Sequence, residues 1–378
     1  MKTSPSTFCG IGAALSLFIA ATTSSVVGQQ TEATTDPVGL VELNIKGTGG
    51  TKSVEVTFLG LGMTRPVAYQ NTAETVSGTT LACNTAGWTD NLYATNPQPG
   101  YFLEVFSGAK KGLLSQVVSC SGTPKTLTVA DDLTALGVEG TNVVFKIRPN
   151  WSLATLFGAT NSAGLGAGSS TTADVVLIYN PNLGGGAGGY DTFYYSNVGG
   201  IIGNGWRKSG GGNGDQSNSP IAIDEALVVK RLLSADLNFT LPGAVKLGQT
   251  ITTVFAGPNF IGNVYPAGVM TLGTTDLGAN PPKYSSGLYS DVNGVSGVKP
   301  GSSTTADLIL IYNATLGGYD TYYYSNVGGI IGTGWRKSGG GNADQSGVVL
   351  ASGRSVFLKR VAGAGAFNWV MPQPFANP

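Results

Sequence analysis

A tandem duplication in the C-terminal half of this 378-residue chain constrains its fold most strongly. Residues 168–231 and 301–360 both begin GSSTTAD, continue into an apolar run that ends LIYN, and close on Lys-Arg. Between these landmarks, YDTFYYSNVGGIIGNGWRKSGGGNGDQS in the first copy matches YDTYYYSNVGGIIGTGWRKSGGGNADQS in the second. A repeat of this length predicts two modules of the same fold.

Each copy predicts four short β-strands, because runs rich in Val, Ile, Thr and Tyr alternate with glycine-rich turns. In the first copy we expect strands at Val175–Tyr179, Tyr190–Ser196, from Trp206 onward, and at Ala226–Leu232. We expect them to form an antiparallel meander, as half of a β-sandwich or open barrel. A kelch propeller is disfavoured, because the copies start about 133 residues apart and kelch repeats recur at about 50.

The amino-acid composition excludes several classes of function. There is no histidine, which excludes Ser-His-Asp and Cys-His catalysis and histidine metal sites. Charged residues make up 11% of the chain, against about 25% in a typical protein, and Lys+Arg and Asp+Glu both number 21. A neutral, charge-poor surface does not attract nucleic acid and favours self-association. We therefore expect a protein that is not an enzyme.

The N-terminus predicts export. Lys2 precedes an apolar run from about Ile11 to Ala21, and no acidic residue occurs before Glu32. This layout is typical of a signal peptide over residues 1–28, cleaved near Gly28. The run is too short to span a bilayer, so we expect a secreted or cell-surface protein without a membrane span after signal removal.

Two cysteines remain after the predicted cleavage, Cys83 and Cys120. In an oxidising compartment they could form a disulfide. The alternative is two buried free thiols, because the sequence does not show whether their Cα atoms lie close enough to be bridged.

The whole mature chain is predicted to be all-β, with an N-terminal β domain at 29–160, a first repeat module at 161–245, and a linker with the second module at 246–378. One short helix-like stretch, Asp131–Leu136, interrupts the N-terminal domain. Strands are expected there at Val38–Ile45, Ser53–Leu61, Tyr101–Gly108, Thr126–Val129 and Asn142–Pro149.

Several spaced motifs carry a family resemblance. They are WTDNLY (88–93), GYFLEVFSGAKKG (100–112), KTLTVADDLTALGVEGTNVVFKIRP (125–149) and WSLATLFG (151–158). In this order they resemble a group of uncharacterised exported proteins from verrucomicrobial-type bacteria, in which a D…LIYN, aromatic-strand and WR unit follows. The resemblance covers most of the mature chain and implies export and β structure, with no assigned activity. This chain departs from the pattern by repeating the closing unit.

Aromatic and arginine side chains of the repeats are candidate ligand-binding residues, since aromatic faces can stack on sugars. The alternative is that these side chains are core residues or cross-strand pairs, because alternate residues of a strand point inward. The candidates are Tyr190, Tyr194, Trp206 and Arg207 in the first copy, and Tyr319, Tyr323, Trp335 and Arg336 in the second.

Oxygen-bearing side chains suggest two further sites. Asn213 and Asp215, with Asn342 and Asp344, lie in glycine-rich loops and could bind calcium, although an Asx-turn explains the same residues. The pairs Asp174 with Asp191 and Asp307 with Asp320 could act in glycoside hydrolysis, or Asp174 and Asp307 could cap turns.

The leading interpretation is an exported structural or surface-layer protein without catalysis, which binds itself or other cell-envelope components. The alternative is a carbohydrate-binding or adhesion module that uses the aromatic strands. No cofactor is expected, apart from possible calcium.

Overall fold

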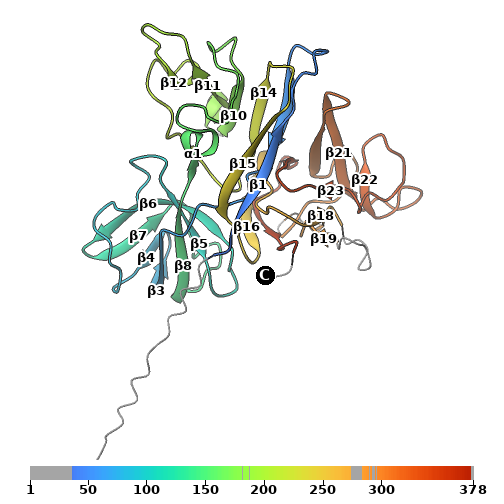
Figure 1. Ribbon diagram of the computed structural model, residues 1–378. Coiled ribbons are helices and arrows are strands. Elements are labelled where there is room, and N and C mark those ends of the chain that lie inside the picture. Colours follow the sequence, from blue (N-terminus) through green and yellow to red (C-terminus); the bar gives the residue numbers. More distant parts are fainter. Residues whose placement is uncertain are drawn as a thin grey trace, which may run out of the picture. The chain divides into compact units, whose positions relative to one another are not determined.

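The computed structural model describes residues 36–180, 182–186, 188–273, 283–288, 290–291, 294 and 296–375. They belong to one compact unit, residues 36–378 (Figure 1). The prediction of an all-β fold is confirmed: the described residues contain twenty-five strands joined by turns, with one α-helix, α1 (Leu153–Phe157), and one 3-10 turn, η1 (Leu183–Gly186). The predicted signal peptide lies outside the described residues.

Six strands close into a barrel in the order β3-β4-β7-β6-β5-β8, which leaves no open sheet edge. Its core includes Leu81, Leu103, Leu127 and Phe145. The helix-like stretch expected at 131–136 is instead a turn, which ends where Gly137 takes a positive φ of 84°. The barrel strands are β3 (Tyr69–Ser77), β4 (Thr80–Ala82), β5 (Tyr101–Val105), β6 (Leu114–Gly122), β7 (Lys125–Val129) and β8 (Thr141–Pro149).

The two repeats form two five-stranded sheets of the same topology, β12-β11-β10-β14-β2 and β22-β21-β20-β24-β17. The first contains β10 (Val175–Asn180), β11 (Gly189–Ser196), β12 (Gly205–Lys208), β14 (Leu227–Arg231) and β2 (Glu55–Leu59). The second contains β20 (Leu308–Asn313), β21 (Gly318–Ser325), β22 (Gly334–Lys337), β24 (Ser355–Lys359) and β17 (Pro258–Gly262).

The predicted meander is wrong in one respect. The fourth strand of each repeat pairs with the first, not with the third, so each repeat is a Greek key. The reason lies at the outer edge of the third strand: the Gln216 N–H donates to the Trp206 carbonyl, and the Gln345 N–H donates to that of Trp335. This loop occupies the edge that a fourth meander strand would need.

Strand pairing also extends the duplication beyond the copies visible in the sequence. In the first half β9 (Trp151–Ser152) pairs with β13 (Pro220–Ile221), and in the second half β18 (Val269–Thr271) pairs with β23 (Val349–Leu350). Strand β1 (Val38–Ile45) of the first half pairs antiparallel with β15 (Leu237–Ala244) of the second. The remaining strands are β16 (Thr250–Val254), β19 (Lys283–Ser285) and β25 (Phe367–Met371).

The barrel is therefore an insertion between β2 and β9 of the first half. The expected N-terminal domain at 29–160 combines this barrel with β1 and β2, which pair with strands of the repeats. Local strand signals cannot separate the two, because they show where a strand occurs and not which strand lies beside it.

Reciprocal aromatic contacts join the halves. Phe260 of β17 packs on Tyr179 and Tyr190 of the first repeat, with ring centroids 4.9 and 5.3 Å away. Phe58 of β2 packs in the same way on Tyr312 and Tyr319 of the second repeat, at 4.9 and 5.6 Å. Each half thus packs a phenylalanine against two tyrosines of the other, and each such ring pair stabilises by about 0.5–1.5 kcal/mol beyond its burial.

Candidate functional site

The aromatic platform predicted for sugar binding is wrong for most of its residues. Trp206, Trp335, Tyr194 and Tyr323 are buried, so their faces are not available to a ligand. The indole N–H of Trp206 donates to the Gly158 carbonyl at 3.0 Å, and its ring packs in the core. The two tryptophans belong to the main core, which was the alternative interpretation of the pattern. Tyr194 and Tyr323 lie on the opposite face of each sheet, across from Arg207 and Arg336.

Arg207 and Arg336 are also buried and hold loops in place. The Arg207 guanidinium donates to the carbonyls of Ile202 and Asn204, at 2.9 and 3.0 Å. Arg336 repeats this arrangement in the second copy. Tyr190 and Tyr319, the remaining candidates, are partly exposed and belong to the inter-half aromatic clusters.

The glycine-rich loops adopt the arrangement of Asx-turns. Asp215 accepts hydrogen bonds from the Ser217 N–H and hydroxyl, and Asp344 accepts one from the Ser346 hydroxyl. Asn213 and Asn342 are exposed beside them. Within the described part of the chain, no three His, Cys, Asp or Glu side chains gather as a metal site would require.

The predicted disulfide between Cys83 and Cys120 is wrong: both are free, buried thiols. Cys83 hydrogen-bonds to β7 through its N–H, and Cys120 lies on β6, the next strand beyond β7. Two strand spacings make about 9.5 Å, beyond the Cα separation of about 4.4–6.8 Å that a disulfide needs. Burial raises the pKa of the Cys83 thiol to about 12, so it stays protonated.

The carboxylates considered for hydrolysis take part in ion pairs. Asp174 is paired with Arg231 at 2.8 Å and Asp307 with Arg360 at 3.1 Å, all four side chains being buried. Asp191 pairs with Lys208 at 2.8 Å, and Asp320 pairs with Lys337 at 2.7 Å. The buried pairs tie the start of each repeat to its closing strand.

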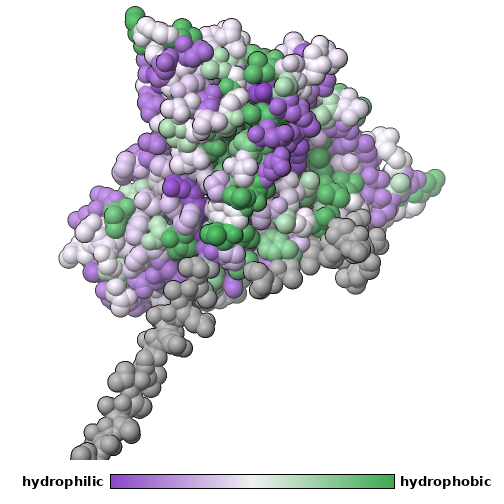
Figure 2. All heavy atoms as spheres, viewed as in Figure 1, coloured by the Kyte–Doolittle hydropathy of each residue, from purple (hydrophilic) through white to green (hydrophobic). Residues whose placement is uncertain are grey.

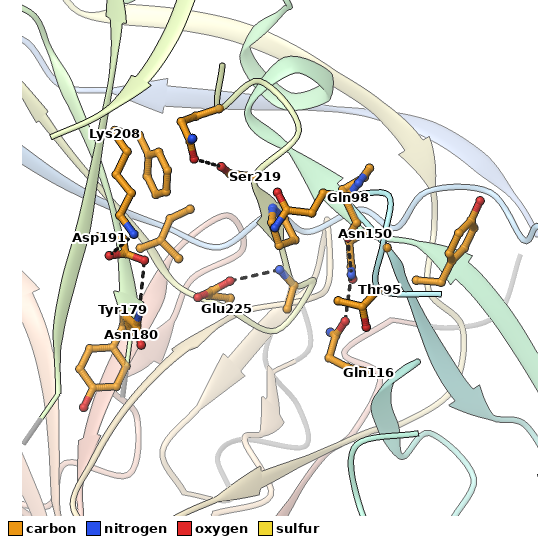
Figure 3. Close-up of a pocket in the computed structure, with 18 of the residues that line it drawn as sticks. Thr95, Gln98, Gln116, Asn150, Tyr179, Asn180, Asp191, Lys208, Ser219 and Glu225 are labelled. Carbon is orange, nitrogen blue, oxygen red and sulfur yellow. Dashed lines mark hydrogen bonds and ion pairs between the residues drawn. The ribbon is translucent and has the colours of Figure 1, made fainter. Parts of the chain in front are cut away.

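A cleft of about 490 Å³ lies between the barrel and the first repeat (Figure 3). Five amide side chains line it, together with the aromatic rings of Tyr101, Tyr179 and Phe193. Barrel residues form one wall and β10–β12 form the other, with Glu225 between them (Figure 3). The amides are Gln98, Gln116, Asn150, Asn180 and Gln216.

The cleft carries little net charge. Asp191 is neutralised by Lys208 and also accepts a hydrogen bond from the Asn180 amide at 3.1 Å. Burial raises the pKa of Glu225 to about 8, so this carboxyl is mostly protonated at neutral pH. Its Oε2 accepts from the Ala222 N–H at 3.1 Å, and its hydroxyl form can donate to a ligand.

Asn150 is held rigidly at the wall of the cleft. Its side-chain amide nitrogen donates to the Pro99 carbonyl at 3.0 Å and to Gln116 Oε1 at 2.9 Å. The residue is 3% exposed, and its Oδ1 has no protein partner. An unpaired buried oxygen is unfavourable, and this oxygen is itself closed off from the surface.

A second cleft of about 650 Å³ adjoins the first and shares Gln116, Tyr179, Ala222 and Glu225 with it. Asp131 and Asp224 lie in its lining. Burial raises the pKa of Asp224, and the nearby Asp131 raises it further. The hydrogen bond from the Thr252 hydroxyl acts in the opposite direction and lowers this pKa. The two clefts make a groove long enough for an extended ligand.

The second half does not repeat this site. Arg354 occupies the position of Glu225, and Ala351 that of Ala222. A pocket of only about 70 Å³ remains there, lined by Trp369 and Met371 of β25. The cleft therefore depends on the barrel insertion and on residues particular to the first half.

Sequence reasoning missed every lining residue except Asp191. The lining comes from several separate segments of the barrel and of the first repeat, which only the tertiary fold brings together. One signal was present: residues 218–229 share only Ala222 with the aligned residues 347–358, although the flanking segments are nearly identical. Divergence within a duplication marks where one copy differs in structure.

Comparisons with known proteins found no matching family model, no similar curated protein and no similar solved structure. Among the described residues, no helix is long and apolar enough to cross a membrane.

Proposed function

We propose that this is an exported binding protein that holds a neutral oligosaccharide in the groove between the barrel and the first repeat. The observation that carries the proposal is the amide-rich lining of the first cleft, whose charged groups are paired or protonated. Export is proposed from the signal-peptide pattern of residues 1–28. Carbohydrate binding is thus proposed for this groove in place of the buried aromatic strands.

The chemistry of the lining matches a polyhydroxylated ligand. Each amide presents a donor and an acceptor, and a sugar hydroxyl also acts as both. Tyr101, Tyr179 and Phe193 add apolar faces for the C–H faces of sugar rings. A charged ligand would have no free counter-charge in the first cleft, and its desolvation would go uncompensated. The cleft volumes lie within the range of about 300–1,000 Å³ usual for ligand sites.

Substitutions of Glu225 test whether this carboxyl is protonated, as the proposal requires. Glu225→Gln keeps a neutral hydrogen-bonding group, so we expect oligosaccharide affinity within about threefold of the original. Glu225→Lys places an unpaired cation in the groove and is expected to weaken binding at least tenfold, about 1.4 kcal/mol. Titration calorimetry with neutral oligosaccharides measures both. Equal loss in the two variants would contradict the proposed role of the protonated carboxyl.

The pKa of Glu225 also predicts how stability depends on pH. Its folded pKa, about 8, is raised above the ordinary value of 4.5, so the folded state keeps a proton that the unfolded state loses. The associated stability is present below pH 4.5 and is lost as pH rises to about 8. Denaturant unfolding at intervals from pH 5 to 9 should show this decline, and Glu225→Gln should flatten it. An identical decline in the variant would assign it to other groups.

A further inference from the structure

The hairpin between the second and third strands of each repeat has been retained where neighbouring segments have diverged. Residues 190–217 differ from 319–346 only at Phe193/Tyr322, Asn204/Thr333 and Gly214/Ala343. The aligned residues of the closing strands, by contrast, read LVVKR at 227–231 and VFLKR at 356–360, so the three apolar positions of this segment all differ. Buried positions have thus changed while an outer hairpin has not.

Structural roles explain only part of this retention. They explain Trp206 and Arg207, which are buried and hydrogen-bonded. They do not explain Ile201 and its counterpart Ile330, which are 91% and 90% exposed. The loop 197–204 around Ile201 contains no charged residue, and its counterpart 326–333 contains none either. We call these two loops the apolar tips.

The same chain carries an apolar groove of about 480 Å³ on the β1–β15 ribbon. Val38 and Leu40, which point outward from β1, are 79% and 71% exposed. Figure 2 shows hydrophobic residues in green at the surface near β1 and β15. In the described part of the chain, this groove is lined without any charged or polar side chain, by Val38, Gly39, Leu40, Pro66, Pro242 and Gly243.

We propose that an apolar tip of one copy inserts into the β1–β15 groove of a second copy. The exposed Ile201 and Ile330 and the lining of the groove are all apolar and uncharged, so a contact between them removes apolar surface from water. The net charge of zero imposes no general repulsion between copies. Pairing between the outer edges of β12 and β22 is a poorer route, because the Trp206 and Trp335 carbonyls already accept bonds within the chain.

The symmetry of this contact determines the assembly. A tip and a groove are different surfaces, so the contact is heterologous and does not close on itself as a two-fold dimer would. Each copy offers two tips and one groove, which allows open chains.

Sedimentation equilibrium on the protein from about 10 µM to 1 mM tests the proposal, since a contact of this small size is expected to be weak. The weight-average mass is expected to rise at least twofold across this range. The double variant Ile201→Glu/Ile330→Glu and the groove variant Leu40→Lys should each remain monomeric. Leu316→Glu changes a leucine in the β20–β21 turn that is 68% exposed, close to the 71% of Leu40, and this variant should assemble as the original does.

Mixing the tip variant Ile201→Glu/Ile330→Glu with the groove variant Leu40→Lys shows whether a tip of one copy binds the groove of another. The tip variant keeps an intact groove and Leu40→Lys keeps intact tips, so the mixture should form complexes of two or three chains. A monomeric original protein at 1 mM, or assembly unchanged in either variant, would overturn the proposal. Ala222→Trp, which blocks the ligand cleft, should leave assembly unchanged, so failure of this proposal is distinguishable from failure of ligand binding.

Discussion

Glu104→Gln is expected to lower the free energy of unfolding by about 3–5 kcal/mol. Glu104 is buried on β5, where Lys246 lies 2.9 Å and Arg148 3.2 Å from its carboxylate. Lys146 and Arg148 also pair with Asp36. Removing the Glu104 charge leaves three buried cations facing one carboxylate.

The pKa of Glu104 predicts a pH dependence of stability, which checks the role of this carboxylate independently. Burial raises it, but Lys246 and Arg148 outweigh burial, and the pKa lies below its ordinary value of 4.5. A depressed folded pKa means that the stabilisation is present above 4.5 and is lost as pH falls through the folded value. Chemical denaturation at pH 7 and in acid measures both effects. The control Glu42→Gln, on the exposed face of β1, should change stability by less than about 0.5 kcal/mol; an equally small effect of Glu104→Gln would contradict this account.

Trp206→Ala and Trp335→Ala are each expected to cost about 3–5 kcal/mol, the range for truncating a buried aromatic side chain. Both rings lie in the main core, where Trp206 contacts Phe157 and Tyr195, and Trp335 contacts Tyr324. The Trp206 variant also leaves the Gly158 carbonyl without its donor, which adds about 1 kcal/mol.

Thermal and denaturant unfolding of the two tryptophan variants provide the measurement, with Tyr319→Ala as a partly exposed aromatic control. The control should lose less stability than either tryptophan variant. If a tryptophan variant kept its full stability and lost only affinity for a glycan, the buried placement of these rings would be wrong.

The strands could be predicted from the sequence because β-branched and aromatic runs between glycine-rich turns signal them locally. Val38–Ile45 and the start of Tyr101–Gly108 match β1 and β5 closely. Strand order could not be predicted, because it depends on contacts such as the Gln216–Trp206 bond that closes the edge of β12. The barrel insertion could not be predicted either, because it also depends on which strands pair with one another.

The binding groove was harder to predict. Gln116 on β6 and Asn180 on β10 are unremarkable polar residues in the sequence, and they become a site only when the barrel lies against the first repeat. Most of the aromatic residues that attracted the sugar-binding prediction are buried, and strand periodicity alone does not show which face of a strand is covered. Glu225 could have been noticed through its replacement by Arg354 in the second copy.

The central claim is that the groove of the first half binds a neutral oligosaccharide. The most direct measurement applies the protein, Ala222→Trp and Ala351→Trp to an array of neutral and acidic oligosaccharides. Ala222 lines both clefts, and Ala351 is its counterpart in the second half, so the two variants carry the same substitution at equivalent positions. We predict binding to neutral oligosaccharides that Ala351→Trp retains and Ala222→Trp loses at least tenfold. Binding to no neutral oligosaccharide, or binding that Ala222→Trp leaves intact, would contradict the account.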